Sequence, residues 1–475
     1  MQTTILDTNQ SIPSMIKRVG EIDFPPRKVY LRTYGCQMNE HDSQRMLFHL
    51  QNLNFSSVED PEQADLVFFN TCAIRDLSNF KFYSHLGETK HIREKNKNVK
   101  IGIGGCVAQN EGNELLTKFP HLNFSIGTDC IDQIGEVVYR VYAGENKVQL
   151  HSWDRTTNYS IETKIVHDSP QAFVNIIKGC DKFCSYCIVP FTRGREKSRS
   201  VEEVVTDVKK LVEYQGIQEV TLLGQNVNSF GKKNGESLAQ LLYELEKIEG
   251  LHLIRYTTSH PYDVTDELVM AHGSLKKLSK HLHLPVQSGS NSILEKMLRE
   301  YTVEHYLSLL EKLRKAKPDI VLSSDIICGF PNETLQEHED TIKLLHLAQY
   351  DFIYSYVFAP RPGTKAAKIE DFLDKEEKSR RLREVQDIQL TIQAKRRLEM
   401  VGNVYRVLVE ERSNRFGLNR WKGRTNCMRI VHFDEDLSLQ TKDDIKWHWV
   451  DVRVDQATAL ASTGKLVKDF GRVHG

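Results

Sequence analysis

The sequence predicts an α/β protein with an open parallel sheet domain, a (β/α)6 partial TIM barrel and a small antiparallel β-barrel in that order. Three observations predict this fold class. From residue 28, short apolar runs alternate with helical patterns, which is typical of parallel sheets. From residue 171, six further strand–helix repeats follow, as in part of a TIM barrel. After residue 400, short alternating runs with turns between them indicate an antiparallel barrel.

Length and composition indicate an ordinary globular protein. The 475 residues suffice for about three domains, with 27% charged and 40% hydrophobic residues. No apolar run approaches the ~20 residues that span a bilayer, and the first 25 residues lack a secretory apolar segment. We therefore expect a cytoplasmic protein with no membrane partner. Its formal net charge is zero, so any nucleic acid must be bound by local charged patches.

Shifts in pattern along the chain predict the domain boundaries. We expect a flexible polar tail over residues 1–27, which ends after Pro25 and Pro26, and an N-terminal domain over 28–143. A polar linker without clear periodicity covers 144–165, and a central domain covers 166–400. The C-terminal domain covers 401–475.

In the N-terminal domain, three predicted strands each end in a cysteine. The predicted strands are "KVYLRTYGC", "DLVFFNTC", "VKIGIGGC" and "LNFSIGT", and the predicted helices are 39–51, 75–95, 110–118 and 131–142. The carboxyl ends of parallel strands meet at one edge of the sheet, so Cys36, Cys72 and Cys106 should lie together. Single buried cysteines are commonly core residues, but three at one topological place favour a metal or cluster site.

The central domain carries three more cysteines after its first predicted strand. Its strands are "AFVNIIKG", "EVTLLGQN", "LIRYTTSH", "HLHLPVQSG", "IVLSSDIICGF" and "FIYSYVFAPRPG". The intervening helices are predicted at 201–215, 237–248, 263–270, 290–298, 303–316 and 334–348. Cys180, Cys184 and Cys187 therefore occupy the first βα loop, at the face of the barrel where active sites lie.

Three thiolates with a C-x-x-x-C-x-x-C spacing limit the choice of metal group. Thiolates select zinc, copper(I) or iron–sulfur clusters, and structural zinc normally takes four ligands. No histidine within 178–195 completes a local zinc site, although a distant one remains possible. A 4Fe-4S cluster held by three cysteines keeps one iron open for a reactive ligand. Phe183 and Tyr186 lie between the thiols, where we expect them to shield such a cluster from water.

The C-terminal part combines a long helical pattern with a modestly basic barrel. Residues 374–400 form the helix, whose basic side chains are read as a solvated face with RNA contact as the alternative. Within 401–475, aromatic and basic residues interleave as they do in single-stranded RNA binders, with a plain packing module as the alternative. The RNA-binding candidates there are Trp421, Lys422, Arg424, Arg429 and Phe433.

The C-x-x-x-C-x-x-C loop after the first barrel strand resembles the signature of the radical S-adenosylmethionine (SAM) superfamily. The whole chain after residue 27 resembles the methylthiotransferase family of that superfamily. The motifs that carry this resemblance are "YGCQMNEHDS", "NTCAIRD", "GGC", "LLGQNVNSF", "LPVQSGSNSILEKMLREYT" and "DIICGFPNET". The family more often has glycine at Asn332, a position that asparagine also fits if the backbone is left-handed.

The resemblance implies two 4Fe-4S clusters and SAM as cofactors. Cys180, Cys184 and Cys187 would hold the cluster that binds and cleaves SAM, and Cys36, Cys72 and Cys106 an auxiliary cluster that carries the sulfur. The C-terminal barrel would be a TRAM domain, which binds RNA. Cys130, Cys328 and Cys427 fit neither triplet and are interpreted as ordinary thiols.

Further site residues follow from the ends of the barrel strands. Gly224, Gln225 and Asn226 lie where the superfamily contacts SAM, with a helix-capping turn as the alternative. Arg193 and Arg195 could meet a SAM carboxylate or an RNA phosphate, or form surface ion pairs. The remaining SAM-binding candidates are Ser259, Gln287, Ser288 and Asp325.

The substrate follows from the branch of the family. "GCQMNEHDS", "LLGQNVNSF" and "VQSGS" resemble the branch that methylthiolates C2 of isopentenyl-bearing adenosine at tRNA position 37. Threonylcarbamoyladenosine in tRNA or a ribosomal-protein aspartate are the alternative substrates, and an electron-transfer scaffold is the non-enzymatic alternative. We expect a monomer that binds a tRNA anticodon stem-loop, a flavodoxin- or ferredoxin-like electron donor and a sulfur carrier.

Overall fold

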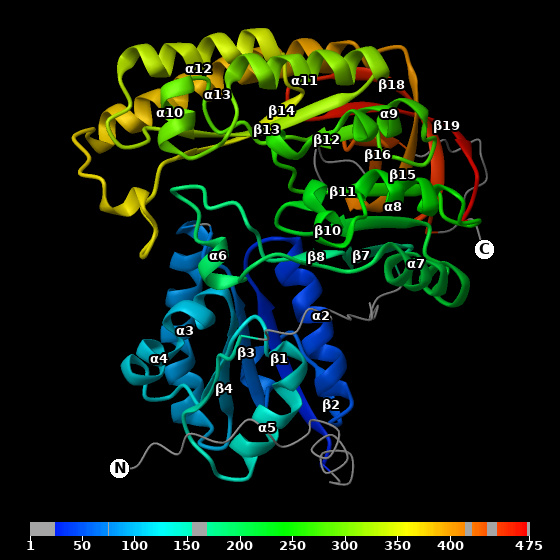
Figure 1. Ribbon diagram of the computed structural model, residues 1–475. Coiled ribbons are helices and arrows are strands. Elements are labelled where there is room, and N and C mark those ends of the chain that lie inside the picture. Colours follow the sequence, from blue (N-terminus) through cyan, green and yellow to red (C-terminus); the bar gives the residue numbers. More distant parts are fainter. Residues whose placement is uncertain (1–23, 75, 154–168, 414–419, 435–443, 473–475) are drawn as a thin grey trace. The chain divides into compact units, whose positions relative to one another are not determined.

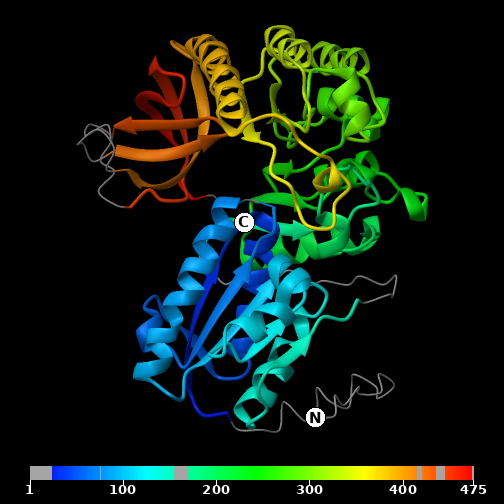
Figure 2. The same ribbon diagram turned by 90° about the vertical axis from the view of Figure 1, so that its left-hand side faces the viewer.

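The structure, a computed structural model, describes residues 24–74, 76–153, 169–413, 420–434 and 444–472. Most of the predicted tail and residues 154–165 of the predicted linker lie outside these ranges. The described residues form two compact units (Figures 1 and 2). The first contains residues 24–153 and the short segment 191–194, and the second contains 169–190 and the described residues from 195 onward.

The first unit is built on a six-stranded parallel sheet with the order β2-β1-β3-β4-β5-β6. The predicted strands are confirmed as β1 (Arg27–Thr33), β3 (Leu66–Thr71), β4 (Lys100–Gly105) and β5 (Phe124–Ile126). Two edge strands were not predicted, β2 (Phe55–Ser57) and β6 (Val148–Leu150). The second of these lies within 144–165, which was predicted as a polar linker without clear periodicity. Each is only three residues long, too short for a visible periodicity.

Helices cover both faces of this sheet (Figure 1). On one face α2 (Gln37–Gln51) and α5 (Ile134–Tyr142) share an apolar core with the strands. On the other face lie α3 (Asp76–Lys95) and α4 (Cys106–Lys118), joined by a hydrogen bond from Tyr83 to Glu111. Glycines in β4 let bulky neighbours close in, because a Cβ at Gly102 would lie 2.1 Å from the ring of Phe124. The helices α2, α3, α4 and α5 confirm the four helices predicted for this domain.

The second unit contains the predicted partial barrel. Its six parallel strands are β7 (Gln171–Asn175), β10 (Glu219–Leu223), β11 (Leu253–Tyr256), β12 (His281–His283), β13 (Val321–Cys328) and β14 (Phe352–Val357). They form two three-stranded sheets, β7-β10-β11 and β12-β13-β14, which the parallel bridge between Ile254 and Leu278 connects. The strands therefore follow one another in chain order, as a (β/α)6 partial barrel requires.

A helix follows each of these strands except the last, which leads into the long helix α13. The barrel helices are α7 (Val201–Gln215), α8 (Leu238–Glu246), α9 (Asp266–Ser274), α10 (Asn291–Lys296), α11 (Val303–Ala316) and α12 (Leu335–Ala348). The starts of α7 and α12 show why helices form there. Ser200 with Glu203 and Thr334 with Glu337 form capping boxes, which satisfy backbone N–H groups at the helix ends.

The C-terminal region consists of α13 (Lys375–Leu398) and a closed five-stranded barrel (Figure 2). Its strands are β15 (Val404–Ser413), β16 (Arg420–Thr425), β17 (Ile430–Asp434), β18 (Trp449–Ala457) and β19 (Ser462–Asp469). This barrel packs onto the partial barrel within the same unit. Arg255 donates hydrogen bonds to the carbonyls of Thr425 and Asn426, and the Trp449 indole donates to Gln218 at 2.9 Å.

Candidate active site

Cys180, Cys184 and Cys187, here called the first triplet, belong to the second unit. They lie in a loop that is fixed at its base and at its tip. Strand β8 (Ile177–Lys178) pairs with β9 (Lys197–Ser198) and closes the loop between them. At the tip, the Ser185 backbone N–H and hydroxyl donate to the carbonyls of Met297 and Lys296, at 3.0 and 2.8 Å. Gly179 turns the chain with a φ of +73°, which favours glycine. The loop is therefore a rigid support for three thiols.

Cys180 and Cys184 are buried, Cys187 is half-buried, and none of the three forms a disulfide. The three thiols lie close enough together to interact electrostatically. Burial, together with the neighbouring thiols, raises the pKa of Cys180 and of Cys187 to about 12. The thiolate forms of Cys180 and Cys187 therefore need a nearby positive charge, which the irons of a cluster would supply. Tyr186 packs into an apolar cluster beside the loop, as expected for shielding. Phe183 does not shield the thiols, because its ring is 44% exposed and lies under the guanidinium of Arg195.

Lys182, within the loop, connects the cysteines to the ends of β10 and β11. Its ammonium lies 2.6 Å from Glu300 and 3.8 Å from Asp263. Asp263 also accepts a hydrogen bond of 2.7 Å from the side-chain amide of Asn226, which follows β10. One network of charges and hydrogen bonds therefore joins the cysteine loop to two of the predicted SAM-binding strand ends.

Four polar atoms at these strand ends are buried without a hydrogen-bond partner among the described residues. They are Gln225 Oε1, Asn226 Oδ1, Ser259 Oγ and His260 Nε2. An unpaired buried polar atom is costly unless a ligand satisfies it. Three of these four residues are the predicted SAM contacts, so the donor set fits a polar ligand such as SAM. Gly224 is required for packing, because a Cβ there would lie 2.0 Å from Ile177, and its contact with SAM stays a prediction.

The later strand ends show weaker signs of a ligand. Gln287 has a φ of +77° and pairs by its backbone with β13. The Ser288 hydroxyl accepts a local hydrogen bond from the Ser290 N–H, and Asp325 lies 3.4 Å from His283. These three predicted SAM contacts stay predictions. Asn332 has a φ of +59°, which is the left-handed geometry expected where the family more often has glycine.

Cys36, Cys72 and Cys106, here called the second triplet, lie at the carboxyl edge of the sheet in the first unit. Cys36 precedes α2, Cys72 follows β3 and Cys106 begins α4. Two glycines show how closely the turns approach one another. A Cβ at Gly35 would lie 2.4 Å from the Cys72 Cβ, and one at Gly105, whose φ is +90°, would lie 2.4 Å from the Thr71 carbonyl oxygen. The sheet therefore brings together three cysteines that are far apart in sequence.

Arg193 is buried beside this second triplet, within the first unit. Its guanidinium lies 2.7 Å from Asp42 and donates to the side-chain oxygen of Asn39. It also lies close enough to Cys36 and Cys106 to interact with both thiols electrostatically. The prediction that Arg193 meets RNA is therefore wrong, because its side chain is only 3% exposed and already paired. Arg195 is 65% exposed and paired with Asp181, so it stays a candidate.

Within the described ranges, no three Cys, His, Asp or Glu side chains converge on the position of a single metal ion. This finding does not conflict with the donor sets above. In a 4Fe-4S cluster each cysteine binds a different iron, so the thiols surround the cluster rather than one ion. Both triplets consist of free cysteines, two buried and one half-buried in each, and fit such a group.

The structure corrects most of the predicted RNA contacts in the C-terminal barrel. Trp421 and Phe433 lie in the barrel core, 1% and 0% exposed, and Arg429 is buried against Asp351. The interleaved pattern is the alternation of a strand, in which Trp421 points inward and its neighbours outward. Lys422 and Arg424 lie on the outer face, where they pair with Glu411 and Glu410. Only these two remain candidates for RNA contact.

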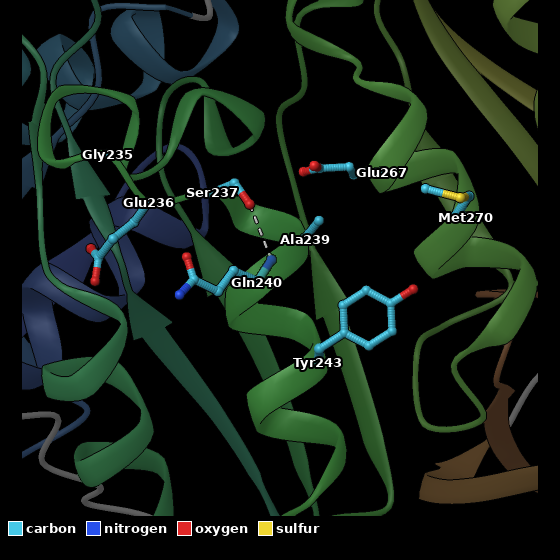
Figure 3. A pocket seen from close by; sticks show the side chains of 8 residues that line it. All are labelled: Gly235, Glu236, Ser237, Ala239, Gln240, Tyr243, Glu267 and Met270. Carbon is cyan, nitrogen blue, oxygen red and sulfur yellow. Dashed lines mark hydrogen bonds between the residues drawn. The ribbon is translucent and has the colours of Figure 1, made fainter.

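A surface hollow of about 510 Å³ lies in the second unit (Figure 3). It is lined by side chains of α8 and α9 and of the turn before α8, with Tyr243 and Met270 as its apolar part. No cysteine or predicted site residue lines it. The extra thiols also stay apart from the triplets: Cys130 contacts Ser152, and Cys427 lies 3.1 Å from the Thr425 hydroxyl.

Sequence reasoning missed several polar residues around the two triplets. Asn39 and Asp42 stand in the motif "YGCQMNEHDS", and Arg299 stands in "LPVQSGSNSILEKMLREYT". The motifs were recognised, but their individual charged residues were not assigned. No signal in these motifs singles out the three residues, because other polar and charged residues stand beside them and burial is decided by the fold.

Comparison with known proteins identifies the family. Residues 174–345 match the Radical SAM superfamily, and residues 28–127 match a family described as Uncharacterized protein family UPF0004. The chain is 40% identical to the tRNA-2-methylthio-N(6)-dimethylallyladenosine synthase of Bdellovibrio bacteriovorus, over 93% of the chain and 96% of that protein. It is 43% identical to the synthase of Thermodesulfovibrio yellowstonii, over 86% of the chain and 93% of that protein. The chain belongs to this synthase family.

Membership in the synthase family agrees with the fold and the donor sets. A radical SAM methyltransferase from Kitasatospora setae, TsrM, has a related fold, with a TM-score of 0.55 over 72% of the chain and 74% of that protein at 12% identity. As a radical SAM enzyme, the synthase-family chain uses a 4Fe-4S cluster and SAM, for which the first triplet and the unpaired atoms are suited. Among the described helices of the chain, none has the length and apolar character to cross a membrane.

Proposed function

We propose that the chain methylthiolates C2 of N6-dimethylallyladenosine at position 37 of tRNA. The observation that carries this proposal is the full-length similarity to synthases named for this reaction, with both cysteine triplets assembled in the structure. When bound, SAM and the two clusters supply the methyl group, the 5′-deoxyadenosyl radical and the sulfur. The side chains described above bind, orient and shield these groups.

The residues of the second unit have the roles of a SAM-binding site. Gln225, Asn226 and Ser259 offer unpaired polar atoms to a ligand with amino and carboxylate groups. Lys182 holds Asp263 and Glu300 at the rim of the cysteine loop, which fixes the loop against the strand ends. Tyr186 and its apolar neighbours keep water from one side of the thiols, which protects a radical from side reactions.

The alternative substrates and the non-enzymatic alternative have less support. The relatives compared above are named for dimethylallyladenosine, not for threonylcarbamoyladenosine or a ribosomal aspartate. A cluster that only carries electrons needs no ligand pocket, whereas this loop borders four buried polar atoms without partners. The anticodon loop suits such an enzyme, because its unstacked bases can be splayed into a protein site.

Partners and location follow from this reaction. The tRNA anticodon stem-loop is the proposed macromolecular substrate, and Lys422, Arg424 and Arg195 are the charged side chains left as candidates for its phosphates. An electron donor of the flavodoxin or ferredoxin class would supply the electron, and a sulfur carrier would restore the transferred sulfur. We propose a monomer in the cytoplasm, where tRNA is modified.

Nucleoside mass spectrometry of tRNA tests the proposed reaction. Deletion of the gene should remove 2-methylthio-N6-dimethylallyladenosine and leave N6-dimethylallyladenosine in its place. The wild-type chain should restore the product, and a chain with Cys180→Ala should not, whereas Cys427→Ala should restore it fully. An unchanged level of the methylthio nucleoside in the deletion strain, with no second synthase present, would refute the assignment.

A further inference from the structure

Arg299 is a buried arginine in direct contact with the first cysteine triplet. Its side chain follows α10 and is 4% exposed. Nη1 donates to the sulfur of Cys184 and to the Tyr186 hydroxyl, both at 3.4 Å. Nη2 donates to the Pro285 carbonyl at 2.8 Å, and Nε to the Tyr301 hydroxyl at 2.9 Å. The guanidinium is therefore held rigidly by four groups, one of which is a predicted cluster ligand.

The charge of Arg299 is not neutralised by the protein. Among the described residues, no carboxylate lies within ion-pair distance of it, and the neighbouring Glu300 pairs with Lys182 instead. A buried cation without a counter-ion is strongly unfavourable. The anionic thiolate sulfur of Cys184 is the contact that can compensate this charge, and it does so only when the thiol is deprotonated, as a cluster ligand is.

The second cysteine triplet also has a buried arginine, but the charge of that arginine is neutralised by a carboxylate. Arg193 lies beside Cys36 and Cys106, but Asp42 neutralises it at 2.7 Å. The protein therefore places an uncompensated positive charge at the triplet of Cys180, Cys184 and Cys187, and a neutral ion pair at the other. Positive charge and N–H···S hydrogen bonds both stabilise the more negative, reduced state of an iron–sulfur cluster.

We propose that Arg299 raises the reduction potential of the cluster at Cys180, Cys184 and Cys187, through its charge and its N–H···S contact with Cys184, and so favours its one-electron reduction. Arg299 acts through the cluster as a positioning and tuning residue. Arg193 also forms a hydrogen bond with the thiol of Cys106, but Asp42 neutralises its charge. The auxiliary cluster therefore lacks the uncompensated positive charge, so an external one-electron donor reduces the first cluster preferentially. The inference rests on the proposed function, because it requires the cluster.

A redox titration followed by electron paramagnetic resonance tests the proposal. The full chain with Cys36, Cys72 and Cys106 changed to Ala isolates the first cluster, and SAM is omitted. In this background Arg299→Gln should reduce the ratio of reduced to oxidised cluster at least tenfold at a fixed potential. That change corresponds to a midpoint shift of about 59 mV in the negative direction for one electron. Arg299→Lys, which keeps the charge, should shift less.

A matched control is Arg380→Gln, which removes a surface arginine of α13 and should leave the midpoint unchanged. In a chain whose first triplet is changed to Ala instead, Asp42→Asn leaves Arg193 without its carboxylate and should raise the midpoint of the auxiliary cluster. An unchanged midpoint in Arg299→Gln with full iron content would overturn the proposal for Arg299. Failure of the unsubstituted loop to take up iron would instead contradict the proposed function.

A measurement that needs no substitution at Arg299 covers the case in which the variants fail to assemble. The chain that lacks the auxiliary cysteines is labelled with 15N-arginine, and the reduced cluster is examined by pulsed electron paramagnetic resonance. Arg299 is the described arginine that donates to a sulfur of this triplet. Coupling to an arginine nitrogen is expected, and its absence from a reduced, iron-loaded sample would overturn the proposed contact.

Discussion

The two cysteine triplets differ in how the chain assembles them. Cys180, Cys184 and Cys187 share one loop, which the pairing of β8 with β9 and the contacts of Ser185 hold in place. Cys36, Cys72 and Cys106 lie on three separate turns, and only the parallel sheet brings them together. A local site thus depends on loop geometry, whereas a distributed site depends on the register of a sheet.

The triplets also differ in the charges that surround them. Each has one buried arginine that contacts a thiol, but Arg193 also has a carboxylate partner, whereas the other partners of Arg299 are neutral groups. The unpaired polar atoms suited to SAM lie in the unit of the first triplet, beside the strand ends that its loop contacts. This difference agrees with the proposed division of labour, in which SAM is cleaved at the first site and the sulfur is stored at the second.

The largest expected effect separates the two sites by iron content. Anaerobic reconstitution of the wild-type chain should give about eight irons per chain, and each triple Cys→Ala variant should retain about four. Both variants should lose the methylthio product entirely. Iron and sulfide analysis measures the first result, and nucleoside mass spectrometry the second. If one triple variant kept all the iron, the triplet replaced in it would hold no cluster. The proposal of two cluster sites would then be wrong.

The ion pair beside the auxiliary triplet predicts a large loss of stability. Asp42→Ala leaves the buried Arg193 without its carboxylate, which should lower the free energy of unfolding of the first unit by about 3–5 kcal/mol. Chemical denaturation followed by the fluorescence of Trp153, which lies in this unit, measures the change. Glu62→Ala, which removes an exposed ion pair with Lys95, is the matched control. Equal effects of the two substitutions would show that Arg193 does not depend on Asp42.

A buried histidine makes the stability of the second unit depend on pH. Burial lowers the pKa of His272 to about 4, and its ring is hydrogen-bonded to the Tyr256 hydroxyl at 2.6 Å. In the unfolded chain His272 therefore binds a proton near pH 6.5, whereas in the folded chain it binds one only near pH 4. Stability from this group is complete above pH 6.5 and is lost as the pH falls toward 4, by about 3 kcal/mol in total.

Denaturation curves at pH 7 and pH 5 measure this effect in the wild type and in His272→Gln. The wild type should lose more stability between these pH values than the variant, because glutamine does not titrate. Parallel loss in the two proteins would contradict the assignment of the effect to His272.

The smallest expected effect concerns one atom of the SAM site. Ser259→Ala removes a buried hydroxyl that has no partner among the described residues, so the SAM-free protein should keep its stability. Binding of SAM should weaken about tenfold, or about 1.4 kcal/mol, and the auxiliary iron should be unaffected. Isothermal titration calorimetry measures the affinity, with Ser308→Ala on α11 as the control. Unchanged affinity would place the ligand away from the end of β11.

The elements of the fold were largely predictable, because most strands and helices are long enough to show their periodicity. The exceptions include the short strands β2, β6 and β9, and the strand β19 of the C-terminal barrel. The cysteine sites were predictable from spacing and from the rule that parallel strands end at one edge. The predicted RNA contacts of the barrel were wrong for Trp421, Phe433 and Arg429, since an aromatic–basic alternation has the same period as a strand with one buried face.

The sequence by itself determined the fold class, the two cysteine triplets and the family, because periodicity, spacing and motif are properties of the linear chain. Only the tertiary structure decided which charges are buried and what compensates them. Nothing in the sequence distinguishes the surroundings of Arg193 from those of Arg299. Arg193 lies a few residues after the C-x-x-x-C-x-x-C motif, and Arg299 lies inside a recognised motif. Folding brings both of them to a thiol but gives only Arg193 a carboxylate, because partners from distant segments meet only when the sheet and the barrel close.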